Sequence, residues 1–598
     1  MPPSCAILLD DSLDPGNPCH LFVDPVEIVT CDRPEDADAA IDRIARGVAD
    51  GHFAAGFLSY ELGYLMEPRL APLLPTERQA PLVWMGLFQE RRRLTSAEAG
   101  EWVRSQVRGG YGIDRLRLST DRAAYLESFR RVLDYIAAGD VYQINLTLKY
   151  LFDFSGDPFA LYQELRRRQR VAFGALIAAP DFHLLSLSPE LFLRIADGTA
   201  EARPMKGTAA RGRTPEEDAE IRRSLAADEK SRAENLMIVD LLRNDLGRVA
   251  EIGSVRVTDL FTVETYRTVH QMTSGIRARL RPGTDLPELL RGLFPCGSVT
   301  GAPKVRAMEI IRELENAPRG VYTGSIGMIS PGGDACFNVA IRTVMIDADG
   351  RGELGIGSGV VHDSLAESEF EECLLKAEFL TRRDPAIRLI ETLRWEPGAG
   401  FWLLDRHLER LAASAAHLGF VCDLSEARQR LEAAVSPPPD APRRVRLLLD
   451  EAGGIEVSAA PMTLPAPGQE LRCALSPCPV DSRDLYLYHK TTRRDFYEAE
   501  FERMQRATGC DEVVFVNERG EVTEGSRMNL FLERDGRLLT PPVRCGLLDG
   551  TLRRELLDSG RAEEAVIHAA EIREAARILL GNSVRGLLPA RMISVGET

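Results

Sequence analysis

The spacing of hydrophobic residues alternates between helical and strand-like along the first half of the chain. Between residues 125 and 136 apolar positions recur at steps of three and four, which predicts an amphipathic helix that Gly139 ends. Residues 141–150 then alternate between apolar and polar, as in a strand with one buried face. Short apolar runs at 53–58 and 83–88 predict two more buried strands.

The middle of this half combines apolar runs with glycine-rich loops. Residues 184–194 predict a strand that carries Glu190 directly after a proline. A loop of glycine, serine and threonine at 294–304 leads into helical periodicity from Val305. Because a helix N-terminus exposes unpaired N–H groups, this loop is a candidate anion site.

Three further segments complete the pattern of the first half. Core strands are predicted from Tyr322 and from Ala340, and the glycine-rich stretch 355–361 predicts a turn where the backbone can approach a ligand. Residues 363–380 predict one helix, on which Glu369, Glu372 and Lys376 share a face. An ordinary salt-bridged surface explains most such faces, so this spacing alone does not assign a function.

A new pattern begins after residue 383. Residues 390–395 and 401–404 predict two strands, residues from 405 a helix, and residues from 445 another strand. The stretch 461–467 is proline-rich and predicts a connector between two lobes. We therefore expect domains at 1–383 (with parts 1–118 and 119–383) and 384–598 (with a small lobe, 384–464, and a large lobe, 465–598).

Composition narrows the class of protein. A chain of 598 residues with 44% hydrophobic residues has material for about two to four globular domains. The formal charge of -16 argues against nucleic acid or an anionic membrane as a partner. The 11 cysteines include no Cys-x-x-Cys pair, the N-terminus lacks the basic region of a signal peptide, and no apolar run reaches the about 18 residues of a membrane span. We expect a reduced, cytoplasmic protein.

Lys206 is the first candidate for chemistry. It stands between Pro204 and Gly207, where a rigid and a permissive residue define a tight backbone path. A lysine that is partly removed from water there could lose its proton and act as a nucleophile. A solvated turn lysine would be the ordinary interpretation of this tripeptide in isolation.

The neighbouring motifs favour the functional interpretation. The Pro-Met-Lys-Gly-Thr stretch, the later Arg-Asn-Asp-Leu-Gly-Arg, Asp-Val-Tyr-Gln-x-Asn, Ser-Pro-Glu-x-Phe and the 294–304 loop resemble the chorismate-using enzymes. That family includes anthranilate synthase and aminodeoxychorismate synthase component I. Anthranilate synthases typically carry alanine at the position of Lys206, whereas aminodeoxychorismate synthases carry lysine, so the resemblance favours the second group.

The resemblance implies roles for particular residues. It makes Lys206 the nucleophile and Glu190 a general acid or base. It implies magnesium on Glu234, Glu369 and Glu372. Its candidates for substrate binding are Thr300, Tyr322, Arg342, Gly359, Lys376 and His270.

The second half resembles the fold-type IV pyridoxal-phosphate enzymes, in particular aminodeoxychorismate lyase. The segments that carry the match are 407–410, 488–492 and 522–531. By this resemblance Lys490 bonds the cofactor, Glu524 faces its pyridine nitrogen, and Thr392 assists proton transfer. The implied cofactor-binding residues are Arg410, Lys490, Glu524, Asn529, Gly550, Thr551, Asn582 and Ser583. Arg493 departs from the pattern, because relatives usually have asparagine there.

Together these features predict an α+β protein with two consecutive activities. The expected fold is an N-terminal two-sheet α/β sandwich of the anthranilate synthase component I type, followed by a two-lobed fold-type IV pyridoxal-phosphate domain. The first half would aminate chorismate to 4-amino-4-deoxychorismate, and the second would eliminate pyruvate to give 4-aminobenzoate for folate biosynthesis. A separate glutamine amidotransferase subunit would supply ammonia, and the lyase half is compatible with a homodimer.

Two alternatives remain open at this stage. One is an enzyme forming anthranilate or salicylate, fused to a branched-chain or D-amino-acid transaminase-like domain. The other is a scaffold protein with two inactive halves, which the charged residues retained at every matched position make unfavourable.

Overall fold

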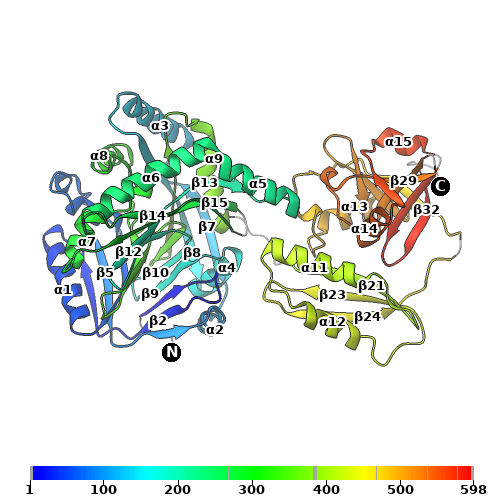
Figure 1. Cartoon of the computed structure of the whole chain (residues 1–598), viewed down its shortest axis with the longest axis horizontal. Coiled ribbons are helices and arrows are strands. Elements are labelled where there is room, and N and C mark those ends of the chain that lie inside the picture. Colours follow the sequence, from blue (N-terminus) through cyan, green and yellow to red (C-terminus); the bar gives the residue numbers. More distant parts are fainter. Residues whose placement is uncertain are drawn as a thin grey trace. The chain divides into compact units, whose positions relative to one another are not determined.

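The computed structural model of the chain describes residues 5–266, 269–381, 387–466, 468–534, 536–575 and 577–593 (Figure 1). It divides into two compact units: residues 1–210 with 222–383, and residues 211–221 with 384–598. The boundary predicted at 383 lies outside the described residues, as does Pro467 of the predicted connector.

The first unit is built on two ten-stranded antiparallel sheets. The first sheet has the order β16 (Gly301–Ala302), β8 (Gln143–Gly156), β20 (Arg351–Val360), β19 (Thr343–Asp347), β10 (Phe182–Ser188), β9 (Phe173–Ala178), β1 (Ala6–Asp10), β2 (Cys19–Val23) and β6 (Arg92–Leu94), with β7 (Tyr111–Leu118) paired to β8. The second has the order β13 (Met205–Ala210), β15 (Val269–Arg279), β12 (Thr199–Arg203), β11 (Leu191–Ala196), β18 (Ala335–Asn338), β17 (Ser325–Ile329), β4 (Phe53–Leu58), β5 (Val83–Phe88) and β3 (Glu27–Cys31), with β14 (Arg256–Thr265) paired to β15.

Three hydrophobic cores arrange this unit in four layers. One core joins the inner faces of the sheets, through side chains such as Ile177 and Leu184 of the first and Phe57 and Trp84 of the second. The outer face of the second sheet packs against α1 (Ala37–Ala49), α6 (Glu229–Gly247) and α7 (Leu286–Leu293). The outer face of the first packs against α2 (Ser96–Gln106), α3 (Arg122–Ala137), α4 (Pro158–Arg168), α8 (Lys304–Leu314), α9 (Ala366–Lys376) and α10 (Glu378–Thr381). The predicted two-sheet sandwich is confirmed.

Several local predictions for this unit are wrong. The predicted turn at 355–361 is instead part of strand β20, which includes residues 355–360. Its glycines let neighbouring side chains approach the strand, because a side chain at Gly355 would collide with the ring of Tyr322. Tyr322 precedes β17 in a turn where Thr323 has φ 61°, and Arg342, with φ 50°, precedes β19. The helix expected over 363–380 is divided into α9 and α10.

The second unit contains a small and a large sheet. The small sheet has the order β22 (Gly400–Phe401), β21 (Leu389–Glu396), β23 (Arg443–Leu449) and β24 (Ile455–Pro461), and packs with α11 (Leu404–Leu418) and α12 (Leu424–Ala433). The large sheet has the order β27 (Val522–Gly525), β26 (Glu512–Val516), β25 (Leu471–Leu475), β32 (Gly586–Met592), β31 (Arg577–Asn582), β28 (Asn529–Arg534), β29 (Arg537–Thr540) and β30 (Ala562–Glu564). Its helices are α13 (Asp495–Thr508), α14 (Thr551–Asp558) and α15 (Ala569–Glu574), while α5 (Pro215–Ala227) spans the residues where the two units divide.

All eleven cysteines are free thiols, and eight of them are buried. No helix among the described residues combines the length and the apolar character that crossing a membrane requires.

Candidate active sites

Lys206 lies on the edge strand β13 of the second sheet. Gly207 takes φ 86°, and the pairing of β13 with β15 slips between Met205 and Thr208, which turns the lysine out of the regular pleat. Its amine reaches the backbone of strand β20: an ideal Cβ at Gly359 would be 2.7 Å from Lys206 Nζ. A side chain at position 359 would therefore displace the amine from this position.

The environment of Lys206 lowers the pKa of its amine. Burial lowers the pKa of Lys206, and the charge of Lys376 lowers it further, while Glu234, Glu190 and Glu372 oppose the shift. An unprotonated amine is the nucleophilic form.

Glu190 is a buried acid between strands β10 and β11, with 4% of its surface exposed. Ser298 Oγ donates a hydrogen bond to Glu190 Oε1 at 2.6 Å. Burial raises the pKa of Glu190 to about 7, although this hydrogen bond and the charges of Lys206 and Lys376 act in the opposite direction. The carboxyl can therefore hold or release a proton near neutral pH.

The predicted metal-binding glutamates lie on helices α6 and α9. Burial raises the pKa of Glu234, and the charges of Glu369 and Glu372 contribute, so the three carboxylates share one electrostatic field. Glu372 pairs with Lys376 at 2.7 Å, and Glu369 accepts a hydrogen bond from Ser364 at 2.7 Å. Within the part of the chain that the structure describes, no three acidic, histidine or cysteine side chains converge closely enough to form a metal site by themselves. Carboxylate oxygens are nevertheless the donors that magnesium prefers, and it commonly completes its shell with substrate oxygens and water.

Three of the remaining predicted substrate residues are Thr300, Arg342 and His270. Thr300 is fully buried with its hydroxyl donated to the carbonyl of Cys296, in the same loop as Ser298. Arg342 directly precedes β19 of the first sheet, whereas His270 lies on β15 of the second, with Nδ1 3.0 Å from the Thr265 hydroxyl. Burial lowers the pKa of Arg342 to about 10, and the Tyr266 hydroxyl opposes this shift. A buried guanidinium of this kind can bind a ligand carboxylate through paired hydrogen bonds.

Sequence reasoning missed Gln143. This first residue of β8 is 1% exposed, and neither its amide nitrogen nor its amide oxygen has a hydrogen-bond partner. A Cβ at Gly359 would be 3.2 Å from Gln143 Nε2, so the amide lies beside the Lys206 amine. A buried, unpartnered amide calls for a ligand or an ordered water. The Asp-Val-Tyr-Gln-x-Asn motif, which contains this glutamine, was the available signal.

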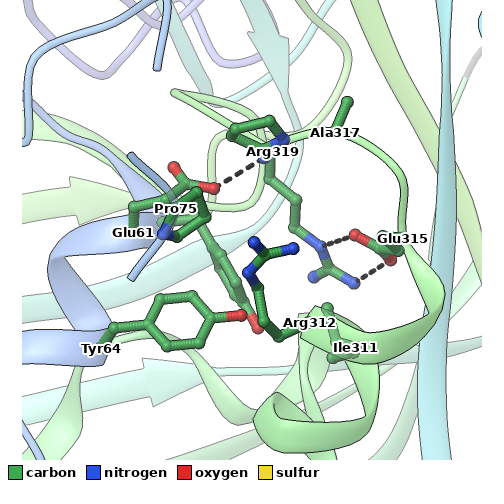
Figure 2. A pocket seen from close by; sticks show the side chains of 10 residues that line it. Glu61, Tyr64, Pro75, Ile311, Arg312, Glu315, Ala317 and Arg319 are labelled. Carbon is green, nitrogen blue, oxygen red and sulfur yellow. Dashed lines mark hydrogen bonds and ion pairs between the residues drawn. The ribbon is translucent and has the colours of Figure 1, made fainter. Parts of the chain in front are cut away.

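A small cavity beside α8 is separate from this site (Figure 2). Arg319 pairs there with Glu315 at 2.7 Å and donates to the carbonyls of Val299 at 2.8 Å and Asn145 at 2.6 Å. None of the predicted substrate residues is among the described residues that line it. The ion pair instead fixes the backbone that precedes Thr300 and the start of β8.

In the second unit, Lys490 follows a short 3-10 helix and is tied to the small lobe. Its carbonyl accepts a hydrogen bond from Ile390 N at 2.8 Å. Burial lowers the pKa of Lys490 to about 7, helped by the charges of Arg494 and Arg410. Much of the amine is then unprotonated at neutral pH, as bonding an aldehyde requires.

Glu524 lies at the end of β27, with 8% of its surface exposed. Asn529 Nδ2 donates to Glu524 Oε2 at 3.2 Å, and Leu548 N donates to Oε1 at 3.3 Å. Burial raises the pKa of Glu524 to about 7. A small cavity borders Glu524 and Arg494. This buried acid beside a cavity fits a group that carries a basic ring nitrogen.

The residues predicted to bind the phosphate differ in their surroundings. Gly550 and Thr551 form the start of α14, and a side chain at Gly550 would collide with Asn529. Arg410, on α11, pairs with Glu391 at 2.7 Å. Asn582 uses its amide oxygen within its own turn, where Oδ1 accepts from Val584 N at 3.0 Å and from Arg585 N at 2.8 Å. Its amide nitrogen donates to the carbonyl of Arg527 at 3.0 Å. The phosphate roles of Asn582 and the adjacent Ser583, and the role of Thr392 on β21, stay predictions.

Comparison with known proteins finds a separate family match for each half of the chain. Residues 18–382, more than half of the chain, match the chorismate binding enzyme family, and residues 388–593 match the class IV amino-transferases. Aminodeoxychorismate synthase of Streptomyces griseus is 46% identical over 278 residues, which cover 46% of this chain but only 38% of that protein. Aminodeoxychorismate synthase component 1 of Escherichia coli (strain K12) is 43% identical over 348 residues, covering 55% of this chain and 76% of that protein.

A solved structure shows the same fold for the first unit. Anthranilate synthase component I from Streptococcus pneumoniae TIGR4 is 25% identical with a TM-score of 0.52, and the match covers 64% of this chain and 93% of that one. The family resemblances inferred from the motifs of both halves are confirmed. The chain belongs to the chorismate binding enzymes and carries a class IV amino-transferase domain in its second half.

Proposed function

We propose that the first unit aminates chorismate to 4-amino-4-deoxychorismate. The observation that carries this proposal is the amine of Lys206, which has a lowered pKa, packs against Gly359 and lies in the field of Glu190. An amine with a lowered pKa and an acid with a pKa of about 7 are a suitable pair for the displacement of a hydroxyl group.

In the proposed reaction Lys206 is the nucleophile and Glu190 is the proton donor. The Lys206 amine bonds to the chorismate ring while the C4 hydroxyl leaves, and Glu190 gives that hydroxyl its proton, so that it departs as water. Ammonia then bonds at C4, and the lysine leaves with its electron pair. Arg342 would contact substrate oxygens, and Thr300 would do so only by exchanging its hydrogen bond to Cys296. Gln143, beside the Lys206 amine, would offer its amide to a polar group of the substrate.

Magnesium would be held by Glu234 and Glu372, with Glu369 close by. The ion would supply positive charge for the ring carboxylate, which two or three glutamates would otherwise repel. Lys376, between Glu372 and the strand β20, would add to this charge.

Ammonia would come from glutamine through a separate glutamine amidotransferase subunit. The relative from Escherichia coli is named as component 1 of its enzyme, which supports a partner of this kind.

The second unit would convert the aminated product to 4-aminobenzoate with release of pyruvate. Lys490 would bond pyridoxal phosphate and move the proton of the carbon that bears the amino group. Glu524 would hold the pyridine nitrogen, and Arg410 with the start of α14 would hold the phosphate. When bound, the cofactor supplies an electron sink for bonds at that carbon. Loss of the pyruvyl group completes an aromatic ring, which favours elimination over transamination.

These two steps would make the chain a cytoplasmic enzyme of folate biosynthesis, since 4-aminobenzoate is a folate precursor. The domain boundaries at 383 and 464 and the homodimer through the second unit belong to the same proposal.

One incubation tests both steps. The purified chain is given chorismate, an ammonium salt and magnesium, and the products are identified by chromatography. We expect 4-aminobenzoate and pyruvate from the native protein, and accumulated 4-amino-4-deoxychorismate from Lys490→Ala. Lys206→Ala should abolish the first step. Normal formation of 4-aminobenzoate by Lys490→Ala, with no other lyase present, would show that the second assignment is wrong.

Anthranilate formation is the second candidate for the first unit, because an anthranilate synthase component shares its fold. The same chromatogram separates anthranilate from 4-aminobenzoate. The lysine at position 206 favours the amination at C4.

A further inference from the structure

Glu391 is a carboxylate on the buried face of an apolar strand. Along β21, the alternate residues Leu389, Glu391, Leu393 and Trp395 are between 0% and 6% exposed, and the three apolar members belong to the core of the small lobe. Removing a carboxylate from water costs several kcal/mol unless partners compensate fully. A glutamate at this position therefore needs a specific reason.

Its partners are two residues from the same helix. Arg410 donates Nε to Glu391 Oε1 at 3.0 Å and Nη2 to Oε2 at 2.7 Å, the two-pronged geometry that fixes a guanidinium plane. His407, 1% exposed and one turn earlier on α11, places Nδ1 2.5 Å from Oε2. The carboxylate thus holds two side chains of α11, those of His407 and Arg410.

Each partner extends the contact to the start of α14. Arg410 Nη1 donates to the carbonyl of Asp549 at 3.4 Å. His407 Nε2 is 3.3 Å from the hydroxyl of Thr551, the first residue of the helix. Burial lowers the pKa of His407, so the ring is neutral near pH 7. With Nδ1–H donated to the carboxylate, Nε2 accepts the threonine hydroxyl proton.

We propose that Glu391 is the positioning residue of the phosphate-binding end of the second unit. It orients Arg410 directly, and through His407 it orients Thr551 and the first turn of α14, whose N–H groups have no intrahelical partners. This inference rests on the proposed cofactor function. It adds that one buried carboxylate sets the geometry of both phosphate contacts, although it contacts no phosphate itself.

The decisive measurement compares pyridoxal phosphate with pyridoxal, which lacks the phosphate. Apoprotein of the full chain and of Glu391→Gln is titrated with each compound, and binding is followed by absorbance. We expect the variant to lose about 10- to 100-fold in affinity for pyridoxal phosphate, the range found when the partner that orients a ligand-binding side chain is removed. Affinity for pyridoxal should stay within about twofold, because a positioning role acts only on the phosphate.

A matched control is available on the same pair of helices. Glu555, on α14, pairs with Arg406 of α11 at 2.7 Å, but 39% of its side chain is exposed. Glu555→Gln removes a carboxylate–arginine pair that does not involve Arg410 or Thr551. We expect this variant to bind both compounds as the native protein does.

A second variant covers the case in which Glu391→Gln fails to fold. His407→Gln breaks the link to Thr551 and leaves the pair between Glu391 and Arg410 in place. The loss should be that of one hydrogen bond, about 3- to 10-fold for pyridoxal phosphate and none for pyridoxal.

The outcomes separate the inference from the proposed function. If the native chain binds no pyridoxal phosphate, both are wrong. If the native chain binds it and Glu391→Gln binds it equally or more tightly, only the positioning role is wrong. Equal losses for pyridoxal phosphate and pyridoxal would also overturn that role, because they would show a general structural effect.

Discussion

Gly359→Ala adds one methyl group at the closest approach between the strand β20 and the Lys206 amine. The new carbon would be 2.7 Å from Lys206 Nζ, whereas ordinary contacts begin near 3.4 Å, so the amine must move by about 0.7 Å (3.4 minus 2.7). A misplacement of about 1 Å can cost a reacting group roughly 100-fold in rate. We therefore expect 4-amino-4-deoxychorismate formation to fall about 10- to 100-fold. Because Gly359 does not adopt a positive φ, the backbone accepts alanine, and the melting temperature should not fall.

The assay is the initial rate with chorismate and an ammonium salt. Gly332→Ala is the matched control, because a methyl group there meets no atom within 4 Å and the residue has no positive φ. If Gly359→Ala reacts at the native rate, the position of the Lys206 amine against strand β20 is not required for catalysis.

Three further predictions follow from charge. Burial raises the pKa of Glu190 from 4.5 to about 7, so its contribution to stability is complete below pH 4.5 and is lost as the pH rises through 7. Glu190→Gln should therefore raise the free energy of unfolding at pH 8 by up to about 3 kcal/mol, but not at pH 4.5; equal effects at both pH values in denaturant titrations would contradict this. Glu234→Gln and Glu372→Gln should shift the magnesium titration of the first step to higher concentration, while the exposed Glu371→Gln on the same helix should not. Bonding of pyridoxal phosphate by Lys490 should rise with pH around a midpoint of about 7, because burial lowers its pKa from 10.5; a midpoint near 10 in the absorbance titration would refute this.

Sequence periodicity predicted the regular parts of the fold. The helix expected over 125–136 is α3, and the apolar runs at 53–58 and 83–88 are β4 and β5 with the same bounds. These elements are buried on a continuous face, so local pattern and tertiary packing require the same conformation. The stretch 355–361 was misread because glycine is common both in turns and in strands that must admit a neighbouring side chain.

The candidate sites depended on motifs more than on periodicity. Lys206 and Glu190 could be named from their motifs, but their shifted pKa values come from burial that only the fold creates. Gln143 was overlooked because a polar residue in a strand usually faces water, and its burial follows from the packing of β8. Glu391 was passed over for the same reason, since its partners lie on another element of the small lobe.

The buried thiols give each half of the protein an internal reporter of opening. Burial raises the pKa of Cys296 and of Cys473 to about 12, so at neutral pH both are protonated and react slowly with alkylating reagents. Cys296 Sγ is 3.2 Å from the Ser298 hydroxyl that binds Glu190, so its alkylation requires the loop of the first site to separate. Cys473 lies in the large sheet of the second unit. The relative alkylation rates of the two cysteines therefore measure how often each half opens, without any engineered residue.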